Sequence, residues 1–136
     1  MKELILVRHG ETDFNAQRRY QGAIDTDLSD QGRTQAQRLT GELKEMPFDV
    51  LVSSPLKRAI QTAEFIARAF DMPIDVREAF SERNLGVFEG LTGEEAETRY
   101  AGLWKRIVTK HLFDAPDGGE SLAECTYRVW RGIDRL

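Results

Sequence analysis

The sequence has little of what marks several large classes of protein. Only one of its 136 residues is a cysteine, so an internal disulfide is excluded, which fits a reducing compartment. Lys and Arg number 19 against 23 Asp and Glu, a net charge of −4, which leaves no basic surplus for a nucleic-acid backbone. The apolar run at residues 4–7 is interrupted at Arg8 and is too short for a signal peptide or a membrane span. We therefore expect a cytoplasmic protein that binds neither nucleic acid nor a membrane.

The pattern of apolar residues indicates a single α/β domain over residues 1–136. Hydrophobic residues make up 40% of the chain and charged residues 31%, values near globular averages that argue against disorder and coiled coil. Short, mostly apolar runs at residues 4–7, 49–52 and 73–76 are typical of strands buried on both faces of a parallel sheet. Because helical patterns alternate with these runs, we predict a parallel-type sheet flanked by helices.

Four helices are predicted from capping residues and from apolar residues spaced three and four apart. The first begins after Ser29, and the second begins near Ser54 and Pro55, a capping residue followed by one suited to the first turn. Capping boxes, each a hydroxyl residue with a glutamate three positions later, open the other two helices. These boxes are Thr92 with Glu95 and Ser121 with Glu124.

Cationic side chains and a histidine follow the first two predicted strands. Arg8, His9 and Gly10 come after the first strand, and residues 53–58, which include Arg58, come after the second. Ligands of open α/β sheets bind beyond the carboxyl ends of the strands, and the planar fork of arginine suits phosphate. Nearby arginines should lower the pKa of His9 and favour the neutral imidazole, which is the nucleophilic form. The pattern therefore predicts an anion site with a nucleophilic histidine.

These residues resemble those of the histidine phosphatase superfamily, which includes phosphoglycerate mutases, fructose bisphosphatases and broad phosphatases. Residues 6–12 read Leu-Val-Arg-His-Gly-Glu-Thr and are similar to the family signature. Further blocks resemble the family in the family's own order and span nearly the whole chain; they are Asn15 and residues 21–22, 27–32, 35–36, 53–63, 82–86, 89–90 and 118–122. Several blocks in order are far more specific than Arg-His-Gly alone.

The resemblance implies a role for each matching residue. It makes His9 the nucleophile that accepts the phosphoryl group and Glu82 the general acid and base, while Arg8 and Arg58 hold the transferring group. The remaining matches are to positions near the phosphate and substrate, namely Asn15, Gln21 and Gly22. The family needs neither a metal nor another cofactor, because arginines supply the stabilising charge. The implied partner is a small phosphorylated metabolite.

The sequence departs from the family pattern in lacking a second histidine. The family carries one in a strand-His-Gly block that follows the helix beginning at Gly-Glu-Ser, and this sequence ends within that helix. His111 is no substitute, because it precedes Gly-Glu-Ser. In the family the later strand lies between the strand ending at His9 and the one ending at Ser53. We therefore expect the N-terminal portion of a longer domain, lacking its later strands, whose open strand edges favour a homodimer.

Three functions follow from the resemblance. Phosphomonoester hydrolysis is favoured, because the segment after Gly22 lacks the tryptophan that phosphoglycerate mutases usually carry there. A mutase is the first alternative and would depend on a bisphosphorylated primer. The second alternative is an inert fragment that binds phosphate without turnover, because the second histidine is absent. Tyr100 and Trp104 suggest a partly apolar alcohol, but the sequence does not identify the ester.

Overall fold

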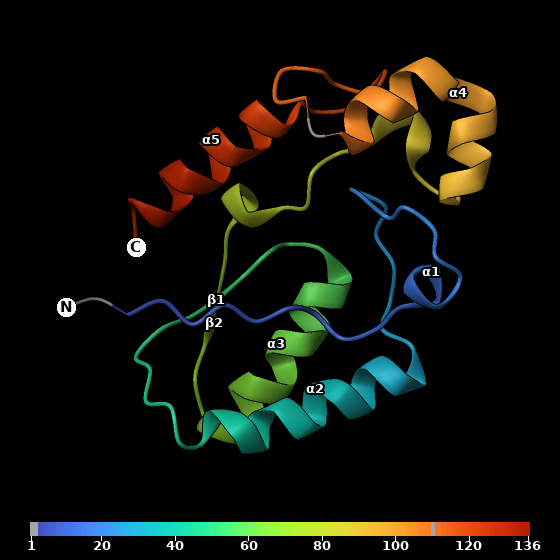
Figure 1. Cartoon of the computed structure of the whole chain (residues 1–136). Helices are drawn as coiled ribbons and strands as arrows, with labels where there is room; N and C mark the ends of the chain where they lie inside the picture. The colour runs from blue at the N-terminus through green and yellow to red at the C-terminus, as the bar shows by residue number, and fades with distance from the viewer. Residues whose placement is uncertain (1–2, 110) are drawn as a thin grey trace.

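Two short parallel strands form the sheet of the computed structural model, which describes residues 3–109 and 111–136 (Figure 1). Strand β1 (Leu51–Ser53) pairs with β2 (Ile74–Val76), with Leu51 opposite Ile74 and Ser53 opposite Val76. Helix α3 (Lys57–Phe70) connects them and contacts both, as expected for parallel neighbours. The prediction of a parallel sheet flanked by helices is confirmed.

The prediction of a strand at residues 4–7 is wrong within the part of the chain that the structure describes. This segment pairs with neither β1 nor β2, and its side chains are open to solvent, with Leu4 52%, Leu6 84% and Val7 41% exposed. An apolar run shows that a segment favours burial. A β-strand also needs hydrogen bonds to a neighbouring strand, and the run does not show whether such a neighbour is present. Within residues 3–136, without residue 110, no such neighbour lies beside it.

Helix α2 (Asp30–Leu43) packs against α3 and forms one core with it (Figure 1). The helix begins where predicted, because the Ser29 hydroxyl accepts a hydrogen bond of 3.1 Å from the backbone N–H of Gly32. Its inner face buries Ala36 and Leu43, while α3 buries Ala63 and Ile66. These small and branched apolar side chains at helical spacing explain why the two helices associate.

Helix α3 begins later than predicted. Its first residue is Lys57, and neither Ser54 nor Pro55 lies within it. The backbone N–H of Lys57 donates to the Asp25 carboxylate at 2.7 Å, and that of Leu56 donates to the Ser54 hydroxyl at 3.3 Å. A carboxylate more than 30 residues away thus supplies the cap, and local sequence rules cannot detect a cap of this kind.

The C-terminal half contains helices α4 (Gly93–Val108) and α5 (Leu122–Ile133), and both predicted capping boxes are confirmed. The 3-10 helices η1 (Glu78–Phe80) and η2 (Gly86–Phe88) precede them. The four-residue helix α1 (Asp13–Ala16) was not predicted, because one turn is too short to show a period. A second core forms here around buried Phe88, Ala96 and Ile107. None of the described helices has the length and apolar character needed to cross a bilayer.

Two helical glycines in the C-terminal half differ in their surroundings and therefore in what alanine should do. A Cβ at Gly132 would lie 2.8 Å from Cβ of Ala79 and 3.1 Å from the Phe80 ring, whereas a Cβ at Gly102 would meet nothing within 4 Å. We expect Gly132→Ala to lower the free energy of unfolding by about 1–3 kcal/mol through overpacking. Gly102→Ala should raise it by about 0.5–1 kcal/mol. Urea unfolding measures both, and equal stabilisation by the two variants would contradict the packing of α5 on η1.

Candidate active site

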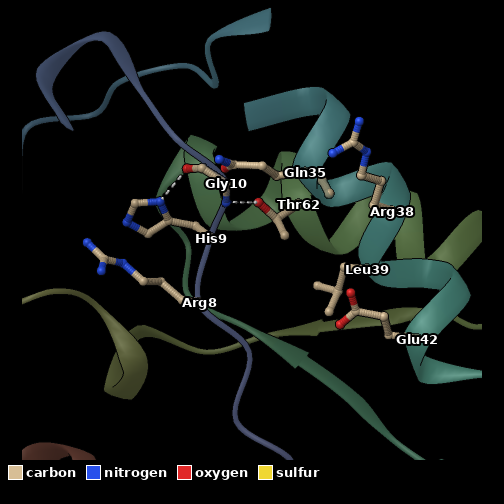
Figure 2. Close-up of a pocket in the computed structure, with 9 residues that line it drawn as sticks. Arg8, His9, Gly10, Gln35, Arg38, Leu39, Glu42 and Thr62 are labelled. Carbon is tan, nitrogen blue, oxygen red and sulfur yellow. Dashed lines mark hydrogen bonds between the residues drawn. The ribbon is translucent and has the colours of Figure 1, made fainter. Parts of the chain in front are cut away.

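The backbone around His9 is held from α3. The Gly10 N–H donates to the Thr62 hydroxyl at 3.0 Å (Figure 2). That hydroxyl donates to the Arg58 carbonyl at 2.8 Å. A Cβ at Gly10 would collide with the Gly32 carbonyl at the start of α2, so only glycine permits this approach. The position of His9 therefore depends on both α2 and α3.

The His9 imidazole is oriented by the backbone carbonyl of the next residue, Gly10. Nδ1 lies 2.7 Å from the Gly10 carbonyl, so in the neutral ring Nδ1 carries the proton and Nε2 keeps its lone pair (Figure 2). The pKa of His9 is lowered, mainly by burial and further by the charges of Arg58 and Arg8. The predicted direction is confirmed, although burial contributes more than the arginines. At neutral pH the ring is therefore a neutral nucleophile with a free Nε2.

Arg58 is one of the most deeply buried side chains, with 2% exposed. Its Nη1 donates to the Ile24 carbonyl and its Nη2 to the Gly22 carbonyl, both at 2.8 Å. Burial lowers the pKa of Arg58, while the nearby carboxylates of Glu82, Asp25 and Glu89 raise it. Two fixed carbonyls therefore hold a positive charge beside His9.

Arg8 and Glu82 complete the charged surroundings of His9. The Arg8 side chain is exposed and lies beside the imidazole, on the same side of the backbone (Figure 2). Glu82 is exposed in the loop after η1, and its Oε1 accepts from the Arg83 N–H at 2.8 Å. The charge of Arg8 lowers the pKa of His9 and that of Glu82 raises it. The structure thus brings together His9, Arg8, Arg58 and Glu82 from three segments of the chain.

The other predicted residues contact the protein itself. Asn15 Oδ1 accepts from the N–H of Thr12 at 3.1 Å, and the Thr12 hydroxyl accepts from the Asn15 N–H at 3.3 Å, so the two residues form the capping box of α1. Gln21 is 8% exposed, and its Oε1 accepts from the hydroxyls of Thr12 at 2.8 Å and Thr26 at 2.6 Å. Gly22 has φ +52°, and its carbonyl accepts from Arg58. The contacts shown brace the loop that carries the Arg58 acceptors, and a role of these residues in binding substrate stays a prediction.

Sequence reasoning missed the side chains that shape the loops around the site. Glu89 Oε1 accepts from the N–H groups of Ala23 at 2.7 Å and Leu85 at 2.9 Å, so it joins the loop before α2 to that before α4. Asp27 accepts from Gln61 Nε2 at 2.6 Å, beside the cap that Asp25 places on α3. Except for Leu85 and Glu89, these partners lie more than 30 residues apart, and no local pattern predicts such pairs.

A cavity of about 300 Å³ lies next to the His9 backbone, with Leu39, Arg38 and Glu42 of α2 in its lining. In Figure 2 these α2 side chains lie on one side of the Arg8–Gly10 backbone, and the Arg8 and His9 side chains project on the other. Arg58 and Glu82 are not part of the lining. Among the described residues, no three His, Cys, Asp or Glu side chains gather as a metal site.

Comparison with known proteins identifies the family of the chain. Residues 4–136 match the model of the histidine phosphatase superfamily, branch 1. The chain therefore belongs to this superfamily, as the sequence resemblance implied.

Individual relatives include both phosphatases and mutase-like proteins. Phosphoserine phosphatase 1 of Hydrogenobacter thermophilus is 40% identical over 129 residues, 95% of this chain and 61% of the relative. Phosphoglycerate mutase-like protein 4 of Arabidopsis thaliana is 38% identical over 137 residues, 98% of this chain and 60% of the relative. The chain thus spans about 60% of the length of these curated relatives.

Solved structures show the same fold. A mycobacterial glucosyl-3-phosphoglycerate phosphatase in complex with VO3 superposes with a TM-score of 0.85 at 35% identity, over 94% of this chain and 61% of that one. A putative alpha-ribazole-5'-P phosphatase from Escherichia coli gives 0.87 at 29% identity, over 96% and 64%. The described fold therefore corresponds to a part of each larger phosphatase fold.

The surroundings of His9 predict its titration. Since its pKa is lowered, NMR should show the ring titrating below 6.5, and Arg8→Ala should raise that pKa by removing a like charge. Arg38→Ala, which removes a charge on the α2 side of the cavity, is the matched control and should change it less. Between the lowered pKa and about 6.5 the unfolded chain binds more protons, so the free energy of unfolding should fall as pH drops through this window. A His9 pKa above 6.5 would contradict the geometry.

Proposed function

We propose that the protein is a phosphomonoester hydrolase that acts on a small phosphorylated metabolite through a phosphohistidine at His9, without metal or other cofactor. One observation carries the proposal. A neutral imidazole, with Nδ1 bound to the Gly10 carbonyl and Nε2 available, lies close enough to two arginines and a carboxylate for their charges to shift its pKa. This combination provides a nucleophile, charge stabilisation for a phosphoryl group and a proton donor.

In the first step the His9 Nε2 lone pair attacks phosphorus while the bond between phosphorus and the alcohol oxygen breaks. Arg8 and Arg58 stabilise the negative charge on the phosphoryl oxygens, and Arg58 does so without reorganising because two carbonyls fix it. Protonated Glu82 donates its proton to the leaving oxygen. The products of this step are the free alcohol, phosphorylated His9 and the Glu82 carboxylate.

In the second step the Glu82 carboxylate removes a proton from water as the water oxygen attacks phosphorus. The bond between phosphorus and Nε2 breaks, and inorganic phosphate leaves. His9 is neutral again and Glu82 is protonated, so the cycle closes. The exposed position of Glu82 supports this double role, because both the alcohol and the water must reach the same carboxyl group.

The alcohol part of the substrate is proposed to lie on the side of the site beyond Glu82. A cavity of about 390 Å³ there is lined by apolar and aromatic side chains, including Tyr20, Leu85 and Trp104, and by Arg83. Tyr100 is not part of this lining, and its ring packs edge-to-face on Phe88 at 5.8 Å. A partly apolar alcohol that also carries an acceptor for Arg83 fits this lining.

Two other functions keep specific support. A mutase is supported by relatives named as such, including a 2,3-bisphosphoglycerate-dependent phosphoglycerate mutase of Bartonella bacilliformis at 34% identity over 138 residues. Phosphate binding without turnover is supported by the exposed segment at residues 4–7 that leads into His9, together with the 60% span of the relatives. Hydrolysis remains the favoured proposal, since it needs no primer.

Hydrolysis of para-nitrophenyl phosphate tests the proposal. His9→Ala should abolish turnover, and Glu82→Gln should lower kcat by about 100-fold or more, in the range of general acid and base catalysis. With this good leaving group, Glu82→Gln should also accumulate an acid-labile phosphoryl group on His9, because attack by water is slowed more than departure of the phenol. Glu78→Gln, an exposed carboxylate four residues earlier, is the matched control and should retain activity.

The other outcomes separate the alternatives. Turnover that survives His9→Ala would overturn the phosphohistidine mechanism. Isomerisation of a phosphorylated substrate only with a bisphosphorylated primer would show the mutase. Binding of inorganic phosphate that His9→Ala weakens, with no hydrolysis by the unaltered chain, would show the inert phosphate-binding protein.

A further inference from the structure

The segment that carries Glu82 has no regular secondary structure to hold it. Residues 81–85 lie between η1 and η2, and Glu82 itself is exposed. Its carboxylate accepts one hydrogen bond, from the N–H of the next residue, Arg83. The place of the carboxylate relative to His9 therefore depends on whatever fixes the backbone on either side of it.

Arg128 of α5 holds the backbone before Glu82. Its Nη1 donates to the carbonyls of Ala79 and Ser81, both at 2.9 Å. Its Nε and Nη2 donate to the two carboxylate oxygens of Glu120 at 3.0 and 2.8 Å, and Nη2 also lies 3.7 Å from the Cys125 sulfur. All five N–H groups of the guanidinium thus have an acceptor. Such a set fixes both the position and the plane of the side chain.

Glu120 holds the backbone after Glu82. Its own N–H donates to the Asn84 carbonyl at 2.8 Å, and its carbonyl accepts from Arg83 Nε at 2.8 Å. The side chains of Glu120 and Arg128 are 19% and 28% exposed, so solvent screens their salt bridge only partly. The Arg128 side chain therefore holds the chain before Glu82, and the backbone of its ion-pair partner Glu120 holds the chain after it.

We propose that Arg128, paired with Glu120, is a positioning residue that sets the reach of Glu82 toward the leaving oxygen. The inference rests on the proposed function, in which Glu82 is the general acid. Lysine cannot replace arginine here, because a single ammonium nitrogen with three donors cannot span both oxygens of Glu120 and two carbonyls at once. Helix α5 would thus serve the reaction without touching the substrate.

Leaving-group dependence distinguishes positioning from a merely structural role. Phenyl phosphate and para-nitrophenyl phosphate are similar in shape, but phenolate is the more basic leaving group and needs the proton more. Arg128→Lys should lower kcat/KM for phenyl phosphate about 10-fold or more, and that for para-nitrophenyl phosphate less than about 3-fold. Arg131→Lys is the matched control. Arg131 lies one turn along the same helix and donates only to the Tyr127 hydroxyl at 3.2 Å among the described side chains, so it should leave both values unchanged.

Glu82→Gln, assayed in parallel, separates failure of this inference from failure of the proposed function. It should show the same leaving-group selectivity as Arg128→Lys, but more strongly. If Glu82→Gln shows no selectivity, the assignment of Glu82 as general acid fails. The positioning role of Arg128 is overturned if Glu82→Gln is selective but Arg128→Lys is not. In that case Arg128→Lys lowers kcat/KM equally for both substrates, or for neither.

Amide hydrogen exchange tests the same inference without turnover. The Ser81 N–H donates to the Glu78 carbonyl at 3.0 Å, and the Arg83 N–H donates to Glu82 itself. Arg128→Lys should speed exchange of these two amides about 10-fold or more, while Arg131→Lys and the amides of α2 stay unchanged. Unchanged exchange at Ser81 and Arg83 would overturn the inference. If Arg128→Lys also speeds amide exchange in α2, the same measurement is made on Glu120→Gln, which keeps the shape of the side chain and removes its charge.

Discussion

The structure of the site depends on the buried guanidinium of Arg58. A positive charge this far from water is tolerated only where hydrogen-bond acceptors replace its hydration, and the carbonyls of Gly22 and Ile24 do so. This need for acceptors constrains the loop as well as Arg58. Arg58 lies in the first turn of α3, so the loop that offers the carbonyls must fold against that helix. Gly22 can present its carbonyl because glycine readily adopts its φ of +52°.

Near Arg58, charged side chains supplement the backbone hydrogen bonds that hold the loops. Backbone hydrogen bonds at Tyr20 join the loop between α1 and α2 to the loop between β2 and α4, but other polar groups of these loops still need partners once buried. Glu89 binds backbone N–H groups of both loops, and Asp25 caps α3 from the first. Arg128 binds two carbonyls of the second. Charged side chains thus add to the backbone hydrogen bonds that hold these loops together.

The candidate site lies where two separate cores meet. One core lies between α2 and α3 and fixes the backbone of His9 through Gly10 and Thr62. The other surrounds Phe88 and supports the loops on the far side of Glu82. Because nucleophile and acid come from different parts of the structure, their separation is set by the long-range ties and not by one rigid element. The exposed apolar residues at positions 4–7 show that the segment leading into His9 is not covered on every side.

By itself the sequence determined where three of the helices begin, because their capping residues depend on neighbours within a few residues. The charge expected around His9 came from the order of strand ends and from the family resemblance, since Arg58 and Glu82 lie far from His9 in the chain. Ser29, Thr92 and Ser121 cap the helices that their local patterns predict. Only the tertiary structure decided that residues 4–7 pair with neither strand, that Asp25 caps α3 and that Arg128 holds the loop of Glu82. Each of these depends on groups brought together from distant parts of the chain. Their partners are chosen by packing and by the need to satisfy buried polar groups, which a local pattern does not encode.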